Sequence, residues 1–142
     1  MNNHARTLSE VLRLLEAGEV TSVALTESVL DRIDTVEPLV QAYLSLDREG
    51  ALRQAEQADI ARNKGTAGPL SGVPLAVKDV LCTTSMPTTC GSRILEHFVA
   101  PYNATVVTKL EQAGSVLLGK LAMDEFAMGS TSENCAFKVP HN

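Results

Sequence analysis

The sequence predicts an α/β domain in which amphipathic helices precede a sheet with a parallel β-α-β unit. Two observations lead to this prediction. The first is helical periodicity near the start of the chain, and the second is a pair of short apolar runs, at residues 73–81 and 115–118, with a helical segment between them. Because such runs lack alternation, they are typical of strands buried on both faces, as in parallel sheets.

Amphipathic helices are expected over about residues 7–37. Thr7 and Glu10 have the spacing of a capping box, and the apolar residues that follow share one helical face as far as Gly18. A second periodic segment should end before Pro38, because the proline ring is incompatible with a continuing helix.

The remaining α/β portion is expected over about residues 40–142, so that the chain 1–142 belongs to one domain. Apolar and polar residues alternate over 40–46, which is the period of a half-buried strand. Residues 48–63 are rich in helix formers and carry a narrow stripe of alanines. This composition predicts a helix with a small-residue contact face.

The β-α-β unit is expected to begin with the apolar run at 73–81. Asn103 could cap the crossover helix, which Gly114 would close before the second strand. The connection over residues 82–102 is long and rich in Thr, Ser and Gly. Loops of this length are usually functional or mobile.

Composition and charge limit the possible environments and ligands. No apolar run approaches a membrane span and the first residues lack the order of a signal peptide, so the expected location is the cytoplasm, with no membrane contact. A net charge of −5 opposes strong binding to a phosphate backbone, so any nucleic-acid contact is expected to belong to a partner.

The cysteines and histidines do not form a recognisable metal site. Cys82, Cys90 and Cys135 are an odd set without C-x-x-C spacing, which favours reduced, structural side chains. The three histidines are too far apart in the sequence for their spacing to indicate a catalytic or metal site. They are His4, His97 and His141.

One segment comes close to a phosphate-binding loop. Gly114 is followed, after four residues, by Gly119 and Lys120, but Leu121 stands where that motif needs Ser or Thr. The intervening residues are apolar, which favours a buried strand that ends at Gly119.

Lys78 is the most unusual residue, because it lies within an apolar run. An ammonium group buried without compensation is costly, and its pKa falls, which would make the lysine a base. The alternative is a surface ion pair at the end of a strand, with Asp79 as the neighbour. Residue types alone favour the ion pair.

Three segments match a known family: GVPLAVKD at 72–79, TTCGS at 88–92 and MDEFAMGSTSEN at 123–134. On these segments the chain resembles the amidase-signature family. The segment 123–134 is similar to the branch of that family that serves as the glutamine-hydrolysing A subunit of tRNA-dependent amidotransferases.

The resemblance implies that the chain is the N-terminal part of an α/β/α fold around a mixed sheet. The family hydrolyses amides with a Ser, cis-Ser, Lys triad, and Lys78 falls on the lysine. Both serines lie in a Gly/Ser-rich signature that this sequence does not contain, so the chain by itself is expected to be inactive. Met128, Gly129 and Ser130 fall on residues expected to line the amide pocket.

The resemblance also implies partners. The A subunit would release ammonia from glutamine and pass it to a B subunit, which would convert misacylated Glu-tRNA or Asp-tRNA with ATP and magnesium. A C subunit would complete the heterotrimer, and this chain itself would bind no cofactor and no metal. Two alternatives stay open, a free amidase of the same family acting on a small amide, and a non-catalytic interaction module.

Overall fold

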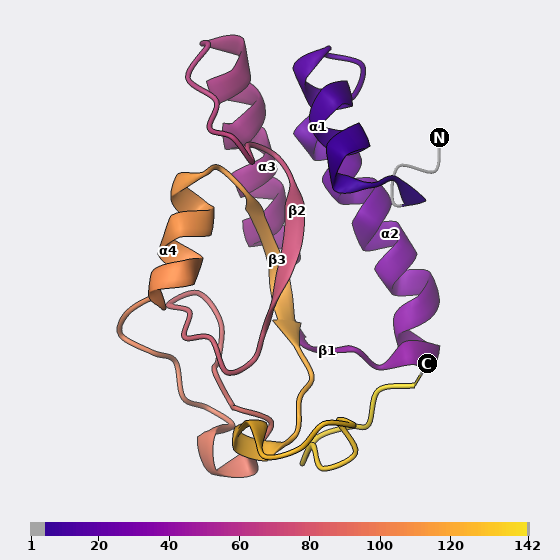
Figure 1. Cartoon of the computed structure of the whole chain (residues 1–142), viewed down its shortest axis with the longest axis vertical. Helices are drawn as coiled ribbons and strands as arrows, with labels where there is room; N and C mark the ends of the chain where they lie inside the picture. The colour runs from indigo at the N-terminus through magenta and orange to yellow at the C-terminus, as the bar shows by residue number, and fades with distance from the viewer. Residues whose placement is uncertain (1–4, 142) are drawn as a thin grey trace. The chain divides into compact units, whose positions relative to one another are not determined.

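The computed structural model describes residues 5–141, whose helices and strands are labelled in Figure 1. In chain order, the elements are α1 (Leu8–Glu16), α2 (Ser22–Val40), β1 (Tyr43–Leu46), α3 (Arg48–Asn63), β2 (Pro74–Lys78), the 3₁₀ helix η2 (Arg93–Leu95), α4 (Thr105–Gln112), β3 (Val116–Leu121) and the 3₁₀ helix η3 (Glu125–Ala127). The prediction of an α/β chain that begins with helices is confirmed.

The chain forms two compact units, each discontinuous in sequence. One contains the residues up to Thr35 together with Arg48–Leu75 and Lys109–Leu118. The other contains Val36–Asp47, Ala76–Thr108 and the residues from Gly119 onward. Whether residues 1–142 belong to one domain stays a prediction.

Helix α1 begins with the expected capping box. The Thr7 hydroxyl accepts a hydrogen bond from the Glu10 amide, and the Glu10 carboxylate accepts one from the Thr7 amide at 2.7 Å. These hydrogen bonds hold the pKa of Glu10 below its usual range. The apolar face of the helix reaches a cluster that contains Val11, Leu15 and Leu25.

Helix α2 extends past the end that the sequence predicts, because Pro38 lies inside it. The prediction that the helix ends before this proline is wrong. Proline removes one amide donor, but the helix stops at Val40, so the loss is confined to the last turn. Within residues 5–141, no helix is long and apolar enough to cross a membrane.

Helix α3 has the predicted bounds and buries its alanine stripe, which consists of Ala51, Ala55 and Ala58. It also supports α2, since the Asp59 carboxylate accepts hydrogen bonds from the first amides of that helix, Ser22 at 2.7 Å and Val23 at 3.1 Å. A carboxylate at a helix N-terminus satisfies amides that have no partner within the helix.

The strands form a sheet in the order β1-β3-β2 (Figure 1). Strand β1 is antiparallel to β3 and shorter than predicted, because residue 40 still belongs to α2. Backbone hydrogen bonds join Val116 to Val73 and Leu121 to Asp79, so the partners advance in the same direction. Strands β2 and β3 are therefore parallel, with α4 as the crossover, and the predicted mixed sheet is confirmed.

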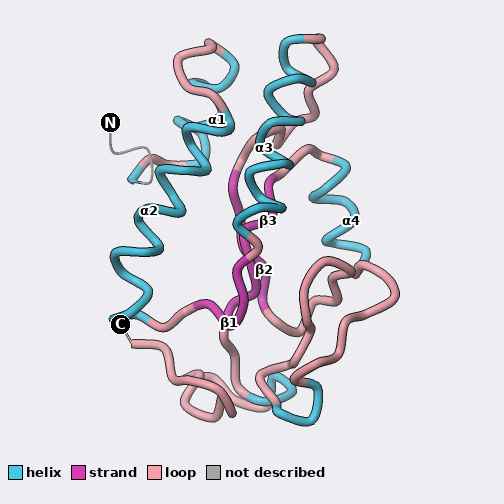
Figure 2. Tube along the Cα trace, turned by 180° about the vertical axis from the view of Figure 1, so that it is seen from behind, coloured by secondary structure: helices cyan, strands magenta, loops and turns pink. Residues whose placement is uncertain are grey.

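The connection from β2 to α4 is mostly loop, as the tube in Figure 2 shows. Its hydroxyl groups are buried within it: the Thr83 hydroxyl donates to the Met86 carbonyl at 3.0 Å, and the Thr88 hydroxyl accepts from the Thr83 amide. At its far end the Asn103 side chain accepts from the Thr84 amide at 2.8 Å. The polar composition of this segment therefore reflects internal hydrogen bonding.

Candidate functional site

Lys78 is the last residue of β2, and its side chain is exposed, between the buried Val77 and Asp79. The apolar environment expected around this lysine is absent from the described residues. The alternative, a surface ion pair with Asp79, is also wrong, because Asp79 is fully buried. The catalytic role of Lys78 stays a prediction.

The buried lysine of the chain is Lys120, on β3. Its Nζ atom lies 3.1 Å from Asp79 Oδ1, and the two side chains are 0% and 1% exposed. The same ammonium group donates to the Pro87 carbonyl at 3.1 Å and to the Thr88 hydroxyl at 2.9 Å. An ammonium group removed from water is stable only when a counter-charge and hydrogen-bond acceptors surround it, as they do here. We call these two residues the Asp79–Lys120 pair.

The other oxygen of Asp79 holds the TTCGS segment. Oδ2 accepts hydrogen bonds from the Thr89 amide at 2.9 Å, from the Thr89 hydroxyl and from the Gly91 amide at 3.5 Å. The backbone of Asp79 donates to Leu121 of β3 at 3.1 Å. Asp79 therefore joins the end of β2, the central strand and residues 89–91.

Residues 124–136, which we call the 124–136 loop, fold around Asp124. Its carboxylate accepts hydrogen bonds from the Asn134 amide at 2.8 Å and the Ser132 amide at 3.0 Å. The Asn134 amide is the largest cause that holds the pKa of Asp124 below its usual range. At Gly129, a Cβ atom would lie 2.4 Å from the Asp124 carboxylate, so only glycine fits beside this anion.

The structure brings the three expected pocket residues together on this loop. Met128, Gly129 and Ser130 are all exposed. Their loop is tied to the TTCGS segment, because the Phe126 amide donates to the Cys90 carbonyl at 2.9 Å. Their role as the wall of an amide pocket stays a prediction.

The backbone of these two segments is strained. Left-handed φ angles, which non-glycine residues rarely adopt, occur at Cys90 (52°), Phe126 (52°), Ala127 (61°) and Ser132 (62°). Such conformations cost free energy and cluster at functional sites, where the surrounding structure holds them. The strain here supports the choice of these segments as the candidate site.

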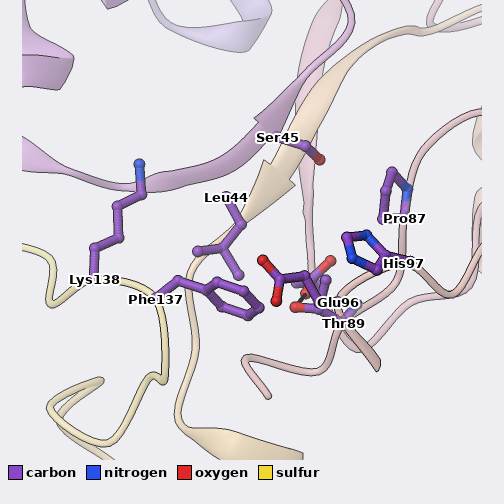
Figure 3. Close-up of a pocket in the computed structure, with 9 residues that line it drawn as sticks. Leu44, Ser45, Pro87, Thr89, Glu96, His97, Phe137 and Lys138 are labelled. Atoms are coloured by element: carbon purple, nitrogen blue, oxygen red, sulfur yellow. Dashed lines mark hydrogen bonds between the residues drawn. The ribbon is translucent and has the colours of Figure 1, made fainter. Parts of the chain in front are cut away.

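A cavity of about 430 Å³ lies beside Asp79. Figure 3 shows Phe137 and Leu44 on one side of it, Pro87 and His97 on the other, and Glu96 and Thr89 between them. Lys138 also lines the cavity (Figure 3), and its ammonium group donates to the Glu37 carboxylate at 2.8 Å. Burial opposes ionisation of Glu37, but this bond and two backbone amides outweigh burial and hold its pKa below the usual range.

The near match to a phosphate-binding loop at residues 114–120 does not form a phosphate site. Lys120, the one lysine in a near match to a phosphate loop, is buried against Asp79 and lies within β3, which continues past Gly119. Among residues 5–141, no cluster of three or more metal-ligating side chains occurs. His97 and His141 are exposed, and His4 lies outside the described residues.

The three cysteines are half-buried and free. Burial, together with the nearby Asp79 charge, raises the pKa of the Cys90 thiol. A raised pKa leaves less of the nucleophilic thiolate, which agrees with the structural role expected from the sequence.

The sequence does not predict the Asp79–Lys120 pair or the role of Asp124. Asp79 and Lys120 are far apart in the chain, and neither segment contains a local signal for the other. Asp124 directly precedes η3, where a helix-start residue would stand, but its side chain binds amides further along the chain. Gly129 is the one signal in the sequence that could have indicated this contact, since a glycine often marks a place where another group lies against the backbone.

The sequence and the fold of this chain are similar to those of known amidotransferase subunits and amidases. The chain is 52% identical to the A subunit of the glutamyl-tRNA(Gln) amidotransferase of Desulfotalea psychrophila over 142 residues, which is all of this chain and 29% of that protein. Its structure matches the corresponding subunit from Thermotoga maritima with a TM-score of 0.78 and 33% identity, covering 100% of this chain and 28% of that one.

A native peptide amidase from Stenotrophomonas maltophilia matches with a TM-score of 0.81 and 34% identity, over 86% of this chain and 26% of that one. The chain thus spans less than a third of the length of these relatives. The Amidase family itself matches residues 24–142. The chain therefore belongs to the Amidase family.

Proposed function

We propose that this chain supplies the catalytic lysine of a glutamine-hydrolysing A subunit of a tRNA-dependent amidotransferase. The observation that carries the proposal is the 52% identity to such a protein across the whole chain. The substrate of the complete assembly would be misacylated Glu-tRNA(Gln) or Asp-tRNA(Asn), converted to Gln-tRNA(Gln) or Asn-tRNA(Asn).

In the proposed mechanism Lys78 acts as the base. Its neutral amine accepts the proton of a serine hydroxyl through a bridging serine, while the serine oxygen attacks the carboxamide carbon of glutamine. The C–N bond then breaks, and the proton returns to nitrogen, so ammonia leaves and an acyl-serine remains. Water hydrolyses that ester to glutamate and restores the serine.

Both serines come from outside this sequence in the proposal, and their segment must also cover Lys78. This requirement follows from the exposure of Lys78, because proton transfer in the proposed mechanism takes place in a site from which water is excluded. Met128, Gly129 and Ser130 would border the pocket for the carboxamide. The absence of a side chain at Gly129 would let the backbone approach the substrate closely.

The partners in the proposal are a B and a C subunit, which together with this one form a heterotrimer in the cytoplasm. The B subunit would bind ATP and magnesium and most of the tRNA. Two observations support this division: the net charge of −5, which disfavours contact with a phosphate backbone, and the burial of Lys120 in the near match to a phosphate loop.

The test is Lys78→Ala in the full-length protein, co-expressed with the other two subunits. We expect glutamine hydrolysis to fall by at least about 10²-fold, because removal of a positioned base costs about that much. Lys64→Ala, which removes an exposed lysine after the end of α3, is the matched control and should retain full turnover. Turnover by Lys78→Ala equal to that of the control contradicts the assignment.

The same preparation separates the alternatives. A free amidase would hydrolyse a simple amide without forming amidated tRNA, and the match to a peptide amidase makes this the second candidate. A non-catalytic module would do neither. Formation of Gln-tRNA or Asn-tRNA that depends on glutamine and Lys78 supports the first proposal alone.

A further inference from the structure

The Asp79–Lys120 pair places two charges where neither has access to water. Removing both ions from water is costly, and apolar side chains of similar volume often give equal or greater stability. Stability is therefore a weak reason for this pair. Its neighbours in the fold suggest another.

Asp79 directly follows Lys78, and successive side chains of a strand point to opposite faces. An inward Asp79 therefore directs Lys78 outward, as their burial shows. The position of Asp79 is fixed from two sides, by the hydrogen bond that its backbone amide donates to the Leu121 carbonyl and by its ion pair with Lys120. The end of β2 is thus attached to β3 through both backbone and side chain.

The Asp79 carboxylate also accepts hydrogen bonds from residues 89–91, whose backbone is in turn hydrogen-bonded to the 124–136 loop. Thr89 and Gly91 donate to Asp79, and the carbonyl oxygens of Cys90 and Gly91 accept from the amides of Phe126 and Ala136 at 2.9 and 2.8 Å. A single anion therefore lies between the base expected at Lys78 and the loop that carries the expected pocket wall.

We propose that Asp79, neutralised by Lys120, is a positioning residue that sets the place of Lys78 relative to the 124–136 loop. This inference rests on the proposed function, since it takes Lys78 as the base and the loop as the pocket wall. Asp79 touches no substrate in this account. Its effect is on the geometry of proton transfer, where a displacement of about 1 Å can cost about 10²-fold in rate.

The experiment measures glutaminase kcat and KM of the full-length protein, in complex with the other subunits, for Asp79→Asn and for the double variant Asp79→Asn/Lys120→Met. Activity is referred to the folded fraction, measured by circular dichroism. We expect kcat to fall about 10- to 100-fold in both, while KM for glutamine changes by less than about threefold. The double variant removes the unpaired ammonium group, so a purely structural role would restore kcat there.

The matched control is Asp59→Asn, which weakens a partly buried carboxylate-to-amide contact at the start of α2. It should leave kcat per folded molecule unchanged. If Asp79→Asn does not fold, the positioning role is tested with Thr89→Val instead. This variant deletes one hydrogen-bond donor to Asp79 and keeps the ion pair with Lys120. A fall in kcat of about tenfold is then expected, and wild-type kcat in Thr89→Val overturns the inference.

Failure of the inference can be told apart from failure of the proposed function. Lys78→Ala is assayed alongside: if it retains turnover, the proposed function is wrong. If Lys78→Ala is inactive while folded Asp79→Asn, or its double variant with Lys120→Met, has wild-type kcat, only the positioning role is wrong.

Discussion

Loss of one partner of the Asp79–Lys120 pair should strongly destabilise the protein, because the other charge is then left buried without a counter-charge. Asp79→Asn leaves the Lys120 ammonium group with the Pro87 carbonyl and the Thr88 hydroxyl but no counter-charge. At 3.1 Å, the attraction between two unit charges is about 5 kcal/mol for an effective dielectric constant of about 20. Measured losses for breaking a buried pair are about 3–5 kcal/mol, and we expect Asp79→Asn to lie in this range.

The assay is urea unfolding of the full-length protein, followed by circular dichroism, for Asp79→Asn, Lys120→Met and the double variant. A loss of about 3–5 kcal/mol is a large part of the about 5–15 kcal/mol by which a domain is stable. The double variant removes both charges, so it should lose less than the sum of the singles, with a coupling energy of about 2–3 kcal/mol.

The control is Asp34→Asn, which breaks the ion pair between Arg48 and Asp34, whose side chains are both exposed. Exposed pairs contribute about 0–1 kcal/mol, so this variant should unfold close to the wild type. A loss below about 1 kcal/mol in Asp79→Asn, or strict additivity in the double variant, would refute the argument from burial.

Two further predictions concern single sites. Gly72→Ala should lower the free energy of unfolding by about 2–5 kcal/mol, because its φ is +80° and a Cβ atom would lie 1.8 Å from Ser22 Oγ; an unchanged urea midpoint contradicts it. The lowered pKa of Asp124 implies stability that is fully present above the usual aspartate range and is lost as pH falls through the lowered value. Hydrogen exchange at the Ser132 and Asn134 amides should show this loss of protection in acid, and protection that persists in Asp124→Asn contradicts it.

Local signals in the sequence predict the elements whose stabilising contacts are local. The start of α1 is predictable because both hydrogen bonds of its capping box join Thr7 and Glu10. The alanine stripe of α3 is predictable because helical periodicity places Ala51, Ala55 and Ala58 on one face. The end of α2 is not, since a proline rule that holds for helix interiors is weak in a last turn.

The candidate site is predictable only in part, and for a different reason. Lys78 and residues 128–130 follow from a resemblance in sequence, which carries residue identities but no contacts. The hydrogen bonds that join these residues run through Asp79 and residues 89–91, and they connect segments that are distant in the chain. No periodicity or spacing encodes such contacts.

The two lysines show why local hydrophobicity could not tell which ammonium group is buried. Each lies near the end of an apolar strand, yet Lys78 is exposed and Lys120 is not. Strand β3 lies between β1 and β2, and its residues from Val116 to Lys120 are all buried, whereas β2 lies at the edge of the described sheet and is only partly buried. A lysine on the central strand has no side open to water and therefore needs a carboxylate. The carboxylate that pairs with it is Asp79, on the parallel neighbour and beside Lys78. Strand order thus determines both which lysine is neutralised by a carboxylate and which lysine stays exposed at the end of its strand.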